Sequence, residues 1–112
     1  MNISLEKNEQ KTLVKLAGDL NIYSVIELKN ALLDVITTTP DTELDLAEVQ
    51  EFDSAALQVL ALAKRAAAKN RNTMRITAHS TSVVNLFELY DLVGFFGDPI
   101  LISTHTATGR PS

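Results

Sequence analysis

The spacing of apolar residues changes at Gly18, and this change limits the possible folds more than any other feature of the sequence. Before it, apolar and polar residues alternate over residues 2–5 and 12–16, and a period of two is typical of half-buried strands. After it, apolar residues recur every three or four positions from about residue 22 to 36, which predicts an amphipathic helix. The side chains that this helix is expected to turn inward are Ile22, Val25, Leu28, Leu32 and Val35.

The rest of the sequence repeats this change of period. Residues 42–49 predict a short strand, residues 54–69 are mostly helix formers, and residues 74–78 predict another strand. A last helix is expected to begin at residue 81 or 82 and to end at Gly94, because glycine readily adopts the left-handed conformation of a helix cap. Its inward side chains are expected to be Val83, Leu86, Phe87 and Tyr90.

Strands that alternate with helices predict an α/β fold whose central sheet is mixed and mostly parallel. The first two strands would form an antiparallel hairpin, and the apolar run P-I-L-I at residues 99–102 would add an edge strand. We therefore expect four or five strands with the helices packed on them. A chain of 112 residues is near the commonest size of one domain, so a single domain is expected over residues 1–112, with about 103–112 as a flexible tail.

Charge and composition narrow the possible partners and locations. Ten lysines and arginines against fourteen aspartates and glutamates give a net charge of -4, which repels a nucleic-acid backbone. The first residues lack the pattern of a signal peptide, and no window approaches the roughly 20 apolar residues of a membrane span. There are no cysteines, which excludes disulfides. We expect a cytoplasmic protein that neither binds nucleic acid nor inserts into a membrane.

The sequence offers little for catalysis, metals or cofactors. Ser54 lacks a G-x-S-x-G elbow, and only His79 and His105 are available as histidine bases. Two histidines without cysteines fall short of the three or four ligands of a metal site, so both are expected to be solvated or to cap an element. No glycine-rich phosphate loop is present. The expected protein is not an enzyme and has no cofactor or metal.

The stretch E-F-D-S-A-A-L-Q-V-L at residues 51–60 is the one candidate site. Asp53 and Ser54 stand where a strand ends and a helix begins, and side-chain oxygens at that position commonly cap the helix. Free backbone N–H groups and the positive end of the helix dipole also make such a position suitable for a phosphate. Capping and regulated modification are compatible, and the residues alone leave both open.

Three stretches, taken in this order of elements, resemble the STAS family of bacterial anti-sigma factor antagonists. They are L-A-G-D-L-N at 16–21, L-D-L-A-E-V-Q-E-F-D-S-A-A-L at 44–57 and L-Y-D-L-V-G-F-F at 89–96. In that family the serine matching Ser54 is phosphorylated by an anti-sigma factor serine kinase, and a dedicated serine phosphatase removes the phosphate. The unmodified form binds the kinase and thereby frees the sigma factor. The resemblance implies a single STAS-like domain with Ser54 as the phosphorylation site.

Two residues depart from the family pattern. Ala56 replaces a glycine, which adds a methyl group near the place where a partner backbone would approach. Asn21 replaces an aspartate, which keeps a hydrogen-bonding oxygen and loses a charge.

The expected partner surface surrounds the start of the helix at residue 54. It consists of Asn21, Tyr23, Asp53, Ser54, Ala55, Gln58 and Leu62. Core packing is the alternative for Tyr23 and Leu62, and Phe95 and Phe96 are equally open between core and contact. A second function is also compatible with a STAS domain, namely a non-phosphorylated subunit that docks on the ATPase of a membrane lipid transporter.

Overall fold

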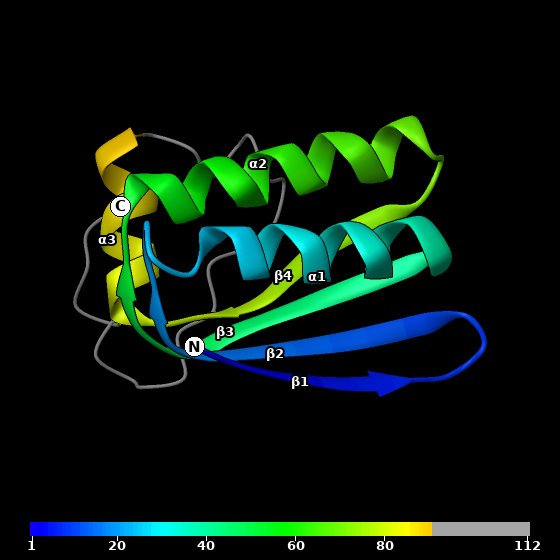
Figure 1. The fold of residues 1–112 in the computed structure, drawn as a ribbon, viewed down its shortest axis with the longest axis horizontal. Helices are drawn as coiled ribbons and strands as arrows, with labels where there is room; N and C mark the ends of the chain where they lie inside the picture. The colour runs from blue at the N-terminus through cyan, green and yellow to red at the C-terminus, as the bar shows by residue number, and fades with distance from the viewer. Residues whose placement is uncertain (91–112) are drawn as a thin grey trace.

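A mixed four-stranded sheet carries the helices of this protein (Figure 1). The computed structural model describes residues 1–90, apart from the side chain of Tyr90. The expectations for Tyr90, Gly94, Phe95, Phe96, the strand at 99–102 and the tail lie outside these residues. The elements are β1 (Asn2–Lys7), β2 (Lys11–Leu20), α1 (Val25–Thr38), β3 (Asp41–Phe52), α2 (Ser54–Lys69), β4 (Thr73–His79) and α3 (Thr81–Tyr90).

The strands are arranged in the order β1-β2-β3-β4. The β1–β2 hairpin is antiparallel, while β3 runs parallel to both β2 and β4. The side chain of Asn8 closes the hairpin turn by accepting hydrogen bonds from the backbone N–H groups of Gln10 and Lys11, both at 2.9 Å. The predicted α/β fold with a mixed, mostly parallel sheet is confirmed.

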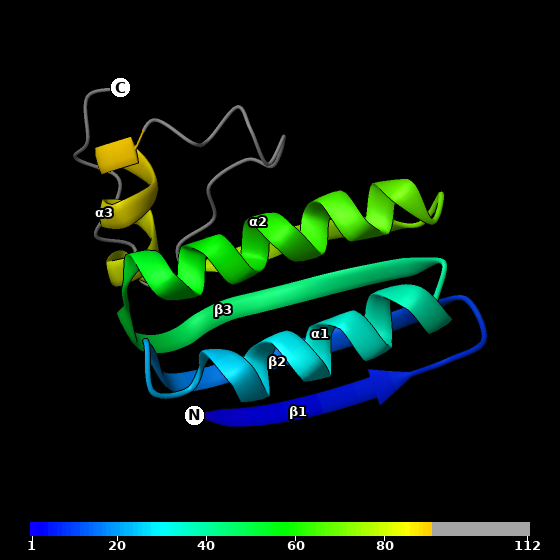
Figure 2. The same cartoon turned by 45° about the horizontal axis from the view of Figure 1, so that its top comes forward.

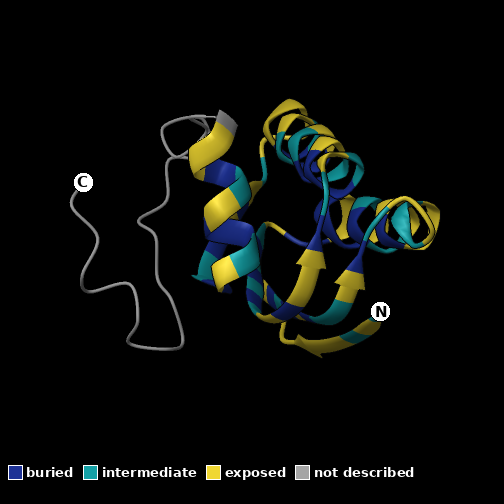
Figure 3. Cartoon of the chain, turned by 90° about the vertical axis from the view of Figure 1, so that its left-hand side faces the viewer, coloured by how far each residue is buried: buried dark blue, intermediate teal, exposed yellow. Residues whose placement is uncertain are grey.

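The helices α1 and α2 lie side by side on one face of the sheet (Figures 1 and 2). Each connects two neighbouring parallel strands, so both helices begin at the edge of the sheet where β2 and β3 end. Their buried sides face the sheet and their outer sides are exposed (Figure 3). The other face of the sheet is polar, and there Glu43 pairs with Lys11 at 3.0 Å and with Arg75 at 2.6 Å.

The core forms between the sheet and these two helices. Alternate residues of the parallel strands point into it, and α2 contributes small side chains that bring its backbone close to the sheet. Its members include Val14, Leu16, Leu44, Leu46, Met74 and Ile76 from the strands, and Leu28, Leu32, Ala56, Leu60, Ala63 and Ala67 from the helices. The third helix is held by an aromatic contact, with the rings of Phe52 and Phe87 centred 6.2 Å apart.

Two expectations about individual side chains are wrong. Helix α1 begins at Val25, because residues 21–24 form a turn in which Ser24 N–H donates to the Asn21 carbonyl at 2.9 Å. Ile22 therefore precedes the helix and is 65% exposed. His79, expected to be solvated or capping, is not solvated: it is 1% exposed and packs edge-on against Phe87, with ring centroids 5.6 Å apart. His79 is the last residue of β4, but it is buried because Phe87 of α3 packs against it.

Helix α2 ends in a paired hydrogen-bond motif that places Arg71 in the left-handed region, with φ at 61°. Arg71 N–H donates to the Ala68 carbonyl at 3.0 Å, and Asn72 N–H donates to the Ala67 carbonyl at 2.8 Å. This is the Schellman arrangement, and glycine is its preferred residue at the position of Arg71 because a Cβ crowds the backbone there.

Replacing Arg71 by glycine should stabilise the protein. We expect Arg71→Gly to raise the free energy of unfolding by up to about 1 kcal/mol, because it removes the cost of a left-handed side chain. Urea unfolding followed by circular dichroism measures this change. Asn70→Gly is the control: Asn70 has a φ of -91° and its side chain donates to the Ala66 carbonyl, so this change should destabilise. Equal shifts in both variants would contradict the assignment.

Candidate regulatory and partner-binding site

The site is assembled by the parallel pairing of β2 with β3. This register sets Leu20 opposite Phe52, so the turn at residues 21–24 and the start of α2 emerge side by side. A further hydrogen bond of 3.2 Å, from Asp53 N–H to the Leu20 carbonyl, continues the ladder past the end of β3. Two segments about thirty residues apart in sequence therefore form one surface at the carboxyl edge of the sheet, where such folds usually place their sites.

Asp53 joins the two segments through its carboxylate. Its Oδ1 accepts the backbone N–H of Ala56 at 3.0 Å and thereby caps α2, as the sequence predicted. Its Oδ2 accepts the backbone N–H of Ile22, also at 3.0 Å. One side chain thus fixes both the start of the helix and the position of the turn that carries Ile22 and Tyr23.

Ser54 is the first residue of α2 and is exposed. Among residues 1–90 its hydroxyl has no hydrogen-bond partner, and neither do the backbone N–H groups of Ser54 and Ala55. Asp53 has taken over the capping role, which leaves the hydroxyl available for chemistry. Free amides and the positive end of the helix dipole would stabilise an anion at this position.

Asn21 connects the turn to the last residues of β3. Its Nδ2 donates to Oε1 of Glu51, and its Oδ1 accepts the backbone N–H of Tyr23 at 2.9 Å. A carboxylate in place of the amide would have no proton to donate to Glu51 and would repel it. The departure to asparagine at this position is thus matched to Glu51, a contact that the sequence analysis did not foresee.

Large apolar side chains project into solvent around Ser54. Tyr23 is 94% exposed, Ile26 is 74% exposed and Leu62 is 39% exposed. Core packing, the alternative interpretation for Tyr23 and Leu62, is wrong. Ile22 and Ile26 were missed as surface residues; Ile26 lies off the buried stripe of α1, which consists of Leu28, Leu32, Val35 and Ile36.

The remaining candidate residues lie along α2. Ala55, Gln58 and Leu62 line a groove of about 490 Å³ between α1 and α2. Ala56 is fully buried, so its methyl group faces the core. The expectation that this methyl narrows the approach of a partner is therefore wrong, because Ala56 lies on the buried face of α2 with Leu60, Ala63 and Ala67.

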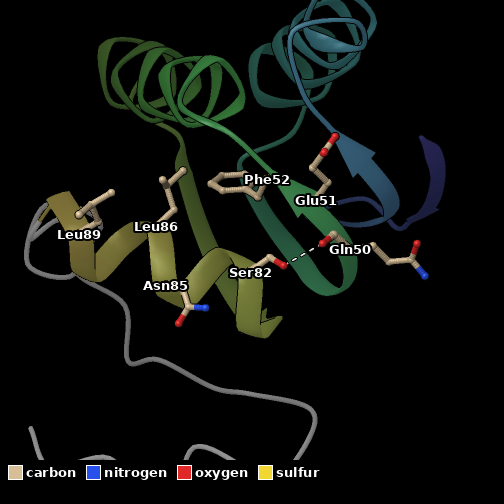
Figure 4. A pocket seen from close by; sticks show the side chains of 7 residues that line it. All are labelled: Gln50, Glu51, Phe52, Ser82, Asn85, Leu86 and Leu89. Atoms are coloured by element: carbon tan, nitrogen blue, oxygen red, sulfur yellow. Dashed lines mark hydrogen bonds between the residues drawn. The ribbon is translucent and has the colours of Figure 1, made fainter.

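A second hollow of about 360 Å³ lies on the other side of β3, against α3. Figure 4 shows Leu86 beside the ring of Phe52, with Ser82 Oγ donating to the Gln50 carbonyl at 2.8 Å. Leu89 on this hollow is exposed, and the lining also includes Glu51, the partner of Asn21. Within residues 1–90 there is no group of three or more possible metal ligands of the His, Cys, Asp or Glu type. No helix in that part is long and apolar enough to cross a membrane.

Comparison with known proteins places this geometry in a family. Residues 3–102 match the family model described as "Mlab, STAS domain". The chain belongs to the STAS domain family. The resemblance inferred from the three sequence stretches is thereby confirmed, as is the fold that it implied.

Individual relatives are anti-sigma factor antagonists. The anti-sigma-B factor antagonist of Bacillus subtilis (strain 168) is 24% identical over 92 residues, which cover 82% of this chain and 84% of that protein. The structure of the anti-sigma factor antagonist SpoIIAA in its unphosphorylated form has a TM-score of 0.72 at 15% identity, covering 94% of this chain and 90% of that one. The phosphorylated form of SpoIIAA, the Bacillus cell fate determinant, has a TM-score of 0.68 at 14% identity, covering 94% of each chain. These structures establish the shared fold.

Removing the Asp53 carboxylate should weaken the whole site. Asp53→Ala should lower the free energy of unfolding by about 1–2 kcal/mol, because it deletes the cap of α2 and leaves the Ile22 amide without its acceptor. Asp53→Asn should cost less, since the amide oxygen can still cap while its NH₂ group cannot accept from Ile22. Urea unfolding measures both. Asp34→Ala, in exposed α1, is the control, and a loss as large as that of Asp53→Ala would refute the bridging role.

Proposed function

We propose that this chain is a non-enzymatic anti-sigma factor antagonist that works by partner switching. Its unmodified form binds an anti-sigma factor that is also a serine kinase, and phosphorylation of Ser54 ends that binding. The observation that carries the proposal is the exposed Ser54 hydroxyl, which lies beside free helix amides because Asp53 does the capping. The names of the relatives support the general function.

The modification is a phosphoryl transfer from ATP. A bond forms between Ser54 Oγ and the γ-phosphorus while the bond from that phosphorus to the β,γ-bridging oxygen breaks, and ADP leaves. The hydroxyl proton passes to a base on the kinase. A serine phosphatase reverses the change by hydrolysis, which consumes water and releases inorganic phosphate. All catalytic groups belong to the partners, and this chain supplies the acceptor.

The added phosphate would change the surface more than the fold. It brings about -1.5 to -2 charges to a position next to Asp53 and close to Glu51. Two free amides at the start of α2 can receive it without breaking a hydrogen bond already present among residues 1–90. A partner that covers Tyr23 and Ile22 would, however, have to desolvate this dianion, which is costly without a paired cation.

Ser54 is expected to be the sole acceptor in a kinase assay. Incubation with a candidate anti-sigma factor kinase and ATP should add one phosphate, detected by intact-mass spectrometry, and Ser54→Ala should abolish it. Ser82→Ala is a matched control, because Ser82 lies in the first turn of α3 but its hydroxyl donates to the Gln50 carbonyl. Phosphate that persists on Ser54→Ala would refute the assignment.

A fixed negative charge at position 54 should imitate phosphorylation and weaken partner binding. Ser54→Asp is expected to weaken binding to the anti-sigma factor kinase by about tenfold or more, because charge and bulk enter the interface. Isothermal titration calorimetry measures this affinity. Thr81→Asp places the same charge at the exposed start of α3 and should leave binding unchanged. Equal affinities for wild type and Ser54→Asp would count against the switch. Recovery of a transporter ATPase instead of a kinase in affinity purification would favour the alternative function, which the named relatives do not.

A further inference from the structure

The strand β1 leaves one edge of the sheet open. It is the outermost strand in the order β1-β2-β3-β4, and within residues 1–90 no strand pairs with its outer side (Figures 1 and 2). Exposed edges are usually protected by prolines, charged side chains or bulges. β1 pairs with β2 without a bulge, contains no proline, and carries its charges only at Glu6 and Lys7. The first part of this edge is therefore unprotected.

The register of the hairpin shows which backbone groups of β1 face outward. Asn8 N–H donates to the Lys11 carbonyl at 2.9 Å, one position beyond the last β1–β2 pair. Hydrogen-bonded and non-hydrogen-bonded pairs alternate along an antiparallel ladder, so Ser4 directs its N–H and C=O groups toward β2. Ile3 and Leu5, on either side of it, direct theirs away from the sheet, where a further strand can pair with them.

The side chains of Ile3 and Leu5 form a small apolar strip at the same edge. They lie opposite Leu16 and Val14 of β2, which belong to the core and are each 1% exposed. Helix α1 packs against β2 and β3, so the cover over this face of the sheet is thinner at β1. Leu5 is 46% exposed and Ile3 is half-buried. An added strand with apolar residues at matching positions would complete their burial.

We propose that β1 pairs with β1 of a second copy of this chain, antiparallel and about a two-fold axis at Ser4. Ile3 of each copy then lies opposite Leu5 of the other, and four apolar side chains meet on the helix-bearing face. Asn2 lies opposite Glu6 on the other face, where its amide can donate to the carboxylate. The contact is the same seen from either copy, as a two-fold interface requires.

The match of β1 with itself is what identifies a second copy as the occupant. An axis at Leu5 would place Ile3 opposite Lys7, and an axis at Glu6 would place two carboxylates opposite each other, which is unfavourable. The axis at Ser4 pairs the strand over its whole length. Two copies of a chain with a net charge of -4 repel each other in general, but β1 carries one glutamate and one lysine, so this contact is electrically balanced.

Such a pairing would join two four-stranded sheets and leave both phosphorylation sites accessible. Asn2 pairs with Ala17 near the end of β2 that leads to the Ser54 surface. Because the two copies run antiparallel, their Ser54 surfaces lie at opposite ends of the joined sheet. The contact consists of two short strands, so it buries less than the roughly 1,200–2,000 Å² of a stable interface and forms a weak, reversible dimer.

Sedimentation of the full chain over about a hundredfold range of concentration tests the pairing. The wild-type chain should shift from monomer to dimer as its concentration rises. Leu5→Lys should weaken the dimer at least about tenfold, because it replaces an apolar contact by a charge on the edge. Ile26→Lys is the matched control, since it makes the same kind of change at a side chain of α1 that is 74% exposed, and it should keep the dimer. Circular dichroism verifies that each variant is folded.

A cross-link tests the register. The chain has no cysteine, so Ser4→Cys introduces a single thiol. At the proposed axis the two copies of residue 4 form a non-hydrogen-bonded pair with Cα atoms about 4.5 Å apart, which a disulfide can span. Mild oxidation should therefore give a covalent dimer on a non-reducing gel. Glu6→Cys, on the same face of β1, is the control: its two copies are four positions out of register, about 13 Å apart, and should not cross-link.

Three results would overturn the pairing: a wild-type chain that stays monomeric at every concentration, a dimer that Leu5→Lys leaves intact, or equal cross-linking of Ser4→Cys and Glu6→Cys. None of these measurements involves a kinase or phosphate, and Ser54→Asp should leave the dimer unchanged. The dimer can therefore fail while Ser54 is phosphorylated as proposed, and it can form in a chain whose Ser54 no kinase modifies.

Discussion

The bidentate use of one carboxylate organises the functional end of this protein. Asp53 accepts one backbone N–H from α2 and another from the turn after β2, so it joins segments that the parallel pairing of β2 and β3 brings together. Because Asp53 caps the helix, Ser54 does not have to. The Ser54 hydroxyl therefore contributes little to the stability of the fold. It can be modified chemically while the domain stays folded.

The surface around Ser54 combines an exposed hydroxyl with exposed apolar side chains. Tyr23 and Ile26 provide exposed apolar area next to the proposed phosphorylation site, where an added dianion is costly to cover. The groove between α1 and α2, lined by Ala55, Gln58 and Leu62 among others, lies beside this surface.

Sequence reasoning reached the fold because apolar periodicity reports directly on burial. The helix Ser54–Lys69 was predicted with its observed bounds, since a polar cap and a run of helix formers mark both of its ends. Ile22 and His79 were misplaced because their exposure depends on tertiary features, a hydrogen-bonded turn before α1 and the packing of α3 on the end of β4. The pairing of Asn21 with Glu51 likewise arises from a contact across thirty residues, which a period cannot reveal, whereas the inward position of Ala56 follows the three- and four-residue spacing that it shares with Leu60, Ala63 and Ala67.

The hairpin turn closed by Asn8 lies at the opposite end of the sheet from the start of α2 (Figure 1). The two ends of the molecule therefore differ, and the proposed phosphorylation site lies at only one of them. Attachment of the protein to a surface through that turn would therefore leave Ser54 of every copy pointing away from the surface and accessible.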